Sequence, residues 1–148
     1  MAVNASFAGR TYPATAPYSV GRAKIQEFAE AVGARDLVHT DPVRARALGY
    51  RDVIAPPTFA VLIAQQCDRQ FIVDPEAGID YARVVHGEMR FVHHRPLTAG
   101  DEIVGVLTVD SVKQAGGHSM VTTRSDLSTT QGELVCTATS TIVIRGGE

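Results

Sequence analysis

The spacing of apolar residues changes about halfway along the chain. In the first half, apolar residues recur at i, i+3, i+4 and i+7, the spacing of one helix face, as at Ile25, Phe28, Ala29 and Val32. Ser19 can cap this segment and Gly33 can end it, so the pattern predicts a helix from Ser19 to Val32. From Arg83 onward apolar and polar residues alternate, which is typical of strands.

Two further helices are predicted before the change in spacing. Asp41-Pro42 is a helix-start pair, and Gly49 can end a short helix over residues 43–48, so we expect Asp41 to cap it. A proline-kinked segment then leads into a long helix with an apolar face made by Phe59, Leu62, Ile63 and Cys67. Because its first half is apolar nearly all round, this helix should be the buried one.

The second half of the chain predicts four strands separated by turns. They cover residues 84–94, 102–113, 119–127 and 134–145 and are expected to form an antiparallel meander. Alternation within the first of them would place His86 and His94 on one face and His93 on the other. Helices followed by strands predict an α+β fold in which a long antiparallel sheet wraps against one apolar helix.

Length, charge and cysteine content narrow the class of protein. A chain of 148 residues with 45% hydrophobic residues fits one domain spanning residues 1–148. A net charge of -2, from 14 basic and 16 acidic residues without basic runs, argues against a nucleic-acid partner. Cys67 and Cys136 fall in a helical and a strand pattern, so we expect buried thiols and no disulfide framework. Without a signal-peptide pattern or a long apolar run, we expect a cytoplasmic protein with no membrane partner.

Residues 33–42 hold the candidate chemistry. This loop lies between two predicted helices and carries His39 with Asp36 and Asp41 nearby. Loops held by rigid elements often carry function, and histidine titrates near neutral pH, so His39 is an acid–base candidate; solvation or capping is the alternative. The other histidines and cysteines offer too few converging ligands for a metal, so we expect no metal site and no cofactor.

Several motifs spread over nearly the whole chain carry a family resemblance. They are residues 18–29 (Tyr-Ser-Val-Gly-Arg-Ala-Lys-Ile-Gln-Glu-Phe-Ala), the loop ending in His39, Ala-Leu-Gly-Tyr at 47–50, Ala-Pro-Pro-Thr-Phe at 55–59, and Arg-Pro-Leu-Thr-Ala-Gly-Asp at 95–101. Together they resemble the hotdog fold and, within it, the MaoC-like (R)-specific hydratase/dehydratase family. The likeness is to its N-terminal-type domain and to the Had-type (3R)-hydroxyacyl-ACP dehydratase subunits of actinobacteria.

The resemblance implies catalytic residues in the loop before His39. The family signature Gly-Asp-x-Asn-Pro-(aliphatic)-His lands on residues 33–39, with His39 as the catalytic base. Ala34 occupies the position of the catalytic aspartate. Asp36 is the nearest substitute acid, and the alternative for Asp36 is a solvated or turn-forming residue.

The resemblance also implies an acyl-binding site at the start of the long helix. Active members have Ala-His-Gly where this chain has Ala55-Pro56-Pro57, and the family places its oxyanion donor there. Proline has no N–H, so the neighbouring amide of Thr58 is the expected donor. The residues expected to contact substrate are Pro57, Thr58, Phe59 and Leu62.

The activity implied by the resemblance is dehydration or hydration of a (3R)-hydroxyacyl thioester in fatty-acid or related lipid synthesis. The substrate would be carried on acyl carrier protein or coenzyme A, and the chain would form a homodimer, or a heterodimer with a MaoC-like subunit. Two arrangements stay open: a self-sufficient enzyme, and a subunit whose partner supplies the complete His-Asp pair. An alternative from another class is a non-catalytic acyl-thioester-binding or regulatory hotdog protein. Thioester hydrolysis is less attractive, because it would require a carboxylate on the long helix and residues 57–66 contain none.

Overall fold

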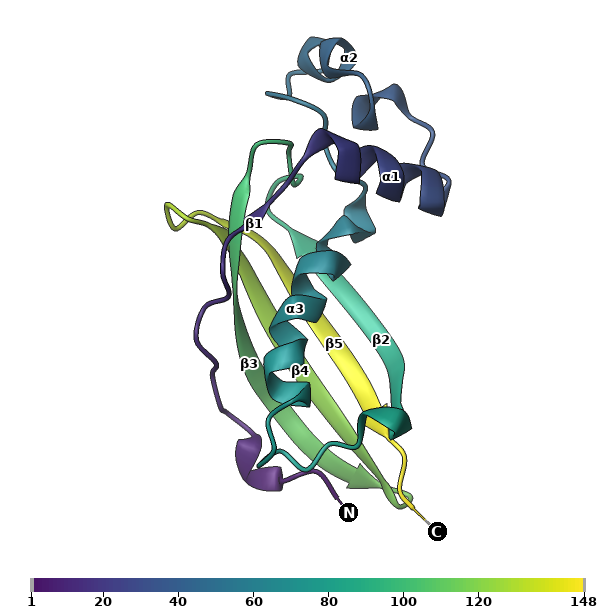
Figure 1. Ribbon diagram of the computed structural model, residues 1–148, viewed down its shortest axis with the longest axis vertical. Coiled ribbons are helices and arrows are strands. Elements are labelled where there is room, and N and C mark those ends of the chain that lie inside the picture. The colour runs from purple at the N-terminus through teal and green to yellow at the C-terminus, as the bar shows by residue number, and fades with distance from the viewer. Residues whose placement is uncertain (1, 148) are drawn as a thin grey trace.

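A curled antiparallel sheet wraps around one helix in the computed structural model, which describes residues 2–147 (Figure 1). The strands are β1 (Tyr18–Ser19), β2 (Val84–His93), β3 (Glu102–Ala115), β4 (His118–Thr129) and β5 (Leu134–Ile144). Their order in the sheet is β1-β3-β4-β5-β2. Helix α3 (Val61–Ile72) packs against β3 and β4. The predicted α+β hotdog architecture is confirmed.

Short helical elements gather beyond one end of the sheet, opposite the two chain termini (Figure 1). They are α1 (Arg22–Val32), the 3-10 turn η2 (Leu37–His39) and α2 (Pro42–Ala47), and we refer to residues 22–47 as the α1–α2 region. The 3-10 turn η3 (Pro57–Ala60) leads directly into α3. Two more 3-10 turns, η1 (Ala5–Phe7) and η4 (Tyr81–Arg83), lie near the N-terminus and before β2.

The predicted strand positions agree closely with the sheet, whereas the predicted pairing was wrong for one strand. Strands β3, β4 and β5 are consecutive neighbours, as a meander requires. Strand β2, however, pairs with β5 rather than with β3, so the segment after β2 crosses from one edge of the sheet to β3, the strand next to the opposite edge. Strand order depends on contacts between residues far apart in the chain, which local alternation does not encode.

A bulge at Gly87 changes which histidines of β2 face the helix. His86 pairs with Ile142 and Glu88 pairs with Thr141, so Gly87 is the extra residue. His93 pairs with Cys136, which is buried on the same side of β5 as Ile142. His86 and His93 therefore both face α3, and the prediction that His86 shares a face with His94 was wrong.

The first long helix begins later than the sequence predicted. Ser19 pairs with Glu102 in the β1–β3 ladder and donates its hydroxyl to the Glu102 carboxylate at 2.6 Å. The helix therefore starts at Arg22, with Gly21 as its N-cap, and the capping role predicted for Ser19 was wrong. The predicted end is confirmed, because Gly33 adopts the left-handed conformation with φ of 73°.

The buried face of α3 holds the sheet and helix together. Ile63, Cys67 and Phe71 are completely buried on this face. A Cβ atom at Gly105 would overlap the sulfur of Cys67, so α3 approaches β3 as closely as a glycine allows. Burial raises the pKa of both Cys67 and Cys136 to about 11, and both thiols are free, as expected from the sequence.

The helices of residues 2–147 are all too short or too polar to cross a membrane.

Candidate functional site

His39 is a buried imidazole held by a backbone carbonyl. Its ring nitrogen Nδ1 lies 2.7 Å from the carbonyl oxygen of Ile54, and the side chain is 9% exposed. A carbonyl only accepts hydrogen bonds, so Nδ1 carries the proton and Nε2 keeps its lone pair in the neutral ring. Ile54 is fixed in turn, because its amide donates to Val38 and it bridges to Thr98. The ring is thus oriented so that Nε2, which has no hydrogen-bond partner among residues 2–147, can act as a base.

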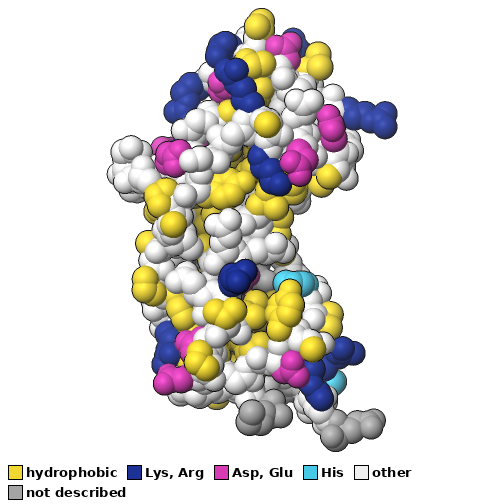
Figure 2. Space-filling view, viewed as in Figure 1, with side chains coloured by type: hydrophobic (Ala, Val, Ile, Leu, Met, Phe, Trp, Pro, Cys, Tyr) yellow, Lys and Arg dark blue, Asp and Glu magenta, His cyan; other side chains and the backbone are white. Residues whose placement is uncertain are grey.

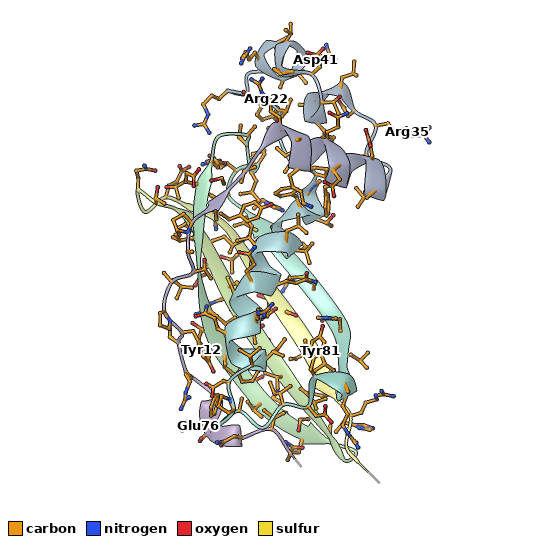
Figure 3. All side chains as sticks on the ribbon, in the orientation of Figure 1. Tyr12, Arg22, Arg35, Asp41, Glu76 and Tyr81 are labelled. Carbon is orange, nitrogen blue, oxygen red and sulfur yellow. The ribbon has the colours of Figure 1, made fainter. Side chains whose placement is uncertain are left out.

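Ala34, at the expected position of the acid, has only a methyl side chain and lies beside a cavity. Ala34 follows the left-handed Gly33 and donates its amide to the Ala29 carbonyl at 2.8 Å. The cavity has a volume of about 350 Å³ and is lined by Ala29, Glu30, Gly33, Ala34, Arg35 and Thr40. Figure 3 shows Arg35 directed away from the body of the molecule. There is therefore space beside position 34 for a larger side chain.

The two aspartates near His39 both cap short helical elements. Asp36 is exposed, and its Oδ1 accepts the Val38 amide at 3.0 Å, at the start of η2. Asp41 accepts the Val43 amide at 2.9 Å, at the start of α2, which confirms its predicted capping role. A catalytic role for Asp36 stays a prediction; its position in this fold is that of a cap.

The start of η3 presents an amide of the kind that an oxyanion hole needs. Pro57 and Thr58 are both exposed. The first backbone hydrogen bond of η3 runs from the Phe59 amide to the Pro56 carbonyl. The Thr58 amide therefore lies before the hydrogen bonds of this turn. The imidazole Nε2 of His93 lies 2.7 Å from the Pro57 carbonyl and ties this turn to β2. Sequence reasoning missed this contact, because the bulge at Gly87 decides which face of β2 His93 occupies.

The other two predicted substrate contacts differ in accessibility. Phe59 is completely buried, with its ring centroid 5.4 Å from that of Phe28 and 6.3 Å from that of Tyr18. Leu62 is half-buried at the margin of the core. Leu62 is therefore open to a ligand in this chain, while Phe59 supports the site from the core.

Ion pairs hold the segments around the site in place. The buried Asp101 carboxylate accepts from Arg95 at 2.8 and 3.0 Å, from Arg51 at 2.9 Å and from the Thr98 amide at 2.8 Å. Burial alone would raise the pKa of Asp101, but these hydrogen bonds outweigh it and keep the pKa below its usual value. Hydrogen bonds from Arg22 likewise lower the pKa of Asp52 to about 2. The carboxylates of Asp101 and Asp52 are thus engaged in structural contacts.

A larger cavity lies at the other end of α3. Its volume is about 710 Å³, and its lining residues are Gln65, Asp68, Arg69, Ile72, Val73, Ile79, Tyr81 and His86. Figure 2 shows a histidine beside a basic side chain at the middle of this face, and Figure 3 places Tyr81 beside the lower half of α3. Asp68 is 5% exposed and accepts the Thr123 hydroxyl at 2.7 Å. Asp68 lies two residues beyond the stretch 57–66, which contains no carboxylate.

Comparison with known proteins gives a consistent result over nearly the whole chain. Residues 6–138 match the family described as FAS1-like, dehydratase domain region. A UPF0336 protein of Saccharopolyspora erythraea is 51% identical over 146 residues, which cover 99% of this chain and 94% of that protein. A UPF0336 protein of Streptomyces avermitilis is 49% identical over 148 residues, covering 100% of this chain and 99% of that protein.

Solved structures share both fold and sequence with the chain. A MaoC-like dehydratase superimposes with a TM-score of 0.88 at 32% identity; the match covers 96% of this chain but only 43% of that longer chain. A subunit of the Mycobacterium tuberculosis HadBC complex, described as a 3R-hydroxyacyl-ACP dehydratase, superimposes with a TM-score of 0.83 at 32% identity, covering 93% of this chain and 96% of that one. The ChsH1-ChsH2 complex of the same organism shares the fold, with a TM-score of 0.73 at 19% identity.

Proposed function

Because this chain belongs to the FAS1-like dehydratase region family and has the MaoC-like hotdog fold, we propose that it is a subunit of a (3R)-hydroxyacyl-thioester dehydratase or hydratase. The substrate is an acyl thioester of acyl carrier protein or coenzyme A, in fatty-acid or related lipid synthesis in the cytoplasm. A MaoC-like partner subunit supplies the complete acid–base pair.

The observation that carries this proposal is a half-complete acid–base pair. Loss of water from a 3-hydroxyacyl thioester needs a base that removes the proton next to the carbonyl and an acid that protonates the leaving hydroxyl. His39 has the orientation of such a base, because Ile54 fixes Nδ1 and leaves Nε2 without a hydrogen-bond partner in the described part of the chain. Ala34 has no ionisable group, and Asp36 is engaged as a cap. The chain therefore needs a partner that supplies a complete pair.

The sheet offers an edge where such a partner can bind. Strand β2 is the last strand on its side, so its outer backbone groups are available for pairing with another strand. Val85 and Val92 are 46% and 49% exposed on this strand, which suits an apolar contact. The HadBC and ChsH1-ChsH2 structures are both complexes, which supports a partnership of this kind for the present chain.

The test compares the chain alone with the chain co-expressed with a MaoC-like subunit that has the intact Asp-to-His motif. Hydration of an enoyl thioester is followed by the loss of its absorbance. We expect turnover only with the partner, and we expect His39→Ala in this chain to leave that turnover unchanged, while replacement of the partner's histidine abolishes it.

Two outcomes would contradict the proposal. Turnover by the chain alone that disappears in His39→Ala would identify a self-sufficient enzyme. Binding of the thioester without turnover in either preparation would identify an acyl-binding protein instead.

A further inference from the structure

The cavity beside the second half of α3 combines apolar walls with one buried hydrogen-bond acceptor. Ile72, Val73 and Ile79 supply apolar walls, and its volume of about 710 Å³ lies in the range of small-molecule sites. Asp68 lines this cavity although it is 5% exposed, and its Oδ1 accepts the hydroxyl of Thr123. A largely buried carboxylate with so few partners favours a ligand that brings a further hydrogen bond.

The surroundings of Asp68 favour a hydroxyl group over an amine. Burial raises the pKa of Asp68, while the Thr123 hydroxyl and the charge of His86 act in the opposite direction. A hydroxyl can donate to the ionised carboxylate and can accept from the protonated carboxyl, so it suits either state. An ammonium group would fit the ionised state alone, and Arg69 on the cavity wall would repel it.

Pairing through β2 would bring this cavity next to the first half of the partner's long helix. Asp68 lies ten residues beyond Thr58, which corresponds to about 15 Å along a helix. When two β2 edges pair antiparallel, the two α3 helices also run in opposite directions. In that arrangement the second half of α3 in this chain lies beside the first half of the partner's helix, which under the proposed function lies next to the partner's bound thioester. A fatty acyl chain held at the partner's site can extend into this cavity.

We propose that this cavity selects acyl thioesters whose chain carries a hydroxyl group far from the thioester, with Asp68 as the hydrogen-bond acceptor. The inference rests on the proposed function for the identity of the ligand as an acyl thioester. Asp68 acts in substrate selection here and takes no part in the loss of water.

The experiment measures binding to the assembled complex by calorimetry, with ω-hydroxydodecanoyl coenzyme A and dodecanoyl coenzyme A as probes. We expect the hydroxylated probe to bind about tenfold more tightly, the gain expected from one hydrogen bond to a charged or buried carboxyl group. Asp68→Leu should reverse this preference, and Asp68→Asn, which keeps the shape of the side chain, should reduce it.

Asp126→Asn is the matched control. Asp126 also accepts a threonine hydroxyl, from Thr137 at 3.1 Å, but it pairs with Val106 and Thr137 on the opposite face of the sheet from the cavity. This variant should keep the tenfold preference. Equal binding of the two probes, or no binding of either, would overturn the inference.

Turnover of the corresponding 2-enoyl thioesters separates the inference from the proposed function. Turnover of both substrates without a difference in binding would overturn the inference and leave the dehydratase proposal in place. A binding preference that depends on Asp68, without turnover of either substrate, would refute the dehydratase proposal and leave the selective cavity in place.

Discussion

The two ends of α3 use their carboxylates differently. Beyond its first residue (Figure 1), Asp36 caps η2, and the buried Asp101 is surrounded by Arg95, Arg51 and the Thr98 amide. Near its last turns, Asp68 accepts only a threonine hydroxyl among the hydrogen bonds of residues 2–147. The first end is built from 3-10 turns and short helices, which need capping and ion pairs to stay in place. The other end is held by long paired strands, so a polar side chain there is available to a ligand.

Introducing the missing acid should have the largest effect. General acid–base groups contribute about 10²- to 10⁴-fold, so Ala34→Asp should give the chain alone a rate of enoyl-thioester hydration about 100-fold above the uncatalysed background. The cavity beside Ala34 provides the space. The double variant Ala34→Asp, His39→Ala should return to the starting rate. An unchanged rate in Ala34→Asp would mean that the first end lacks more than a carboxylate.

Removing the Asp101 carboxylate should have the next largest effect, a loss of stability. Asp101→Ala is expected to lower the free energy of unfolding by about 2 kcal/mol in urea titration, because two guanidinium groups lose their buried partner. The cost is moderated because both guanidiniums still contact water. Glu133→Ala removes the exposed partner of the same Arg95 and should cost less than about 1 kcal/mol. Equal costs for the two variants would show that burial at Asp101 is unimportant.

The carboxylates at the two ends of α3 should change the stability in opposite directions as the pH rises. The pKa values of Asp52 and Asp101 are lowered, so the stability they contribute is present above the ordinary carboxyl pKa of about 4 and is lost as the pH falls through their lowered values. The pKa of Asp68 is raised, so its ionisation opposes folding as the pH rises through that value. Asp68→Asn should therefore be more stable than the parent at pH 7, with the difference shrinking in acid. A constant loss at every pH would instead make Asp68 a structural residue.

Removing a cap should have the smallest effect. Asp36→Ala is expected to cost about 0.5 to 1 kcal/mol in thermal or urea unfolding, the usual value of one capping bond. Hydration by the complex should stay unchanged. A loss of turnover larger than the loss of folded protein would assign Asp36 a catalytic role after all.

The sheet could be predicted well from local alternation, and its pairing could not. Along β5 buried and partly exposed positions alternate from Cys136 to Ile144, and the predicted limits of 134–145 match the observed strand to within one residue. The pairing of β2 with β5 and the bulge at Gly87 depend on partners more than forty residues away. Ser19 illustrates the same limit, because a residue that can cap a helix was held instead by the edge of β3.

The candidate site was also only partly visible in the sequence. The spacing from Gly33 to His39 identified the histidine and the missing acid, but a backbone carbonyl such as that of Ile54 has no sequence signature. Asp68 did leave a signal. It lies on the i, i+3, i+4, i+7 face formed with Ala64, Cys67 and Phe71, and a lone carboxylate on a buried apolar face indicates a specific partner.

Because Cys67 packs closely against Gly105, the rate at which its thiol is labelled measures how often α3 separates from β3. A protonated thiol covered by backbone reacts with alkylating reagents only while α3 is separated from β3. Cys136, buried in β5, reports in the same way on opening of the sheet. In variants that keep one cysteine each, the two labelling rates would show whether the helix leaves before the strands separate or whether both open in a single event.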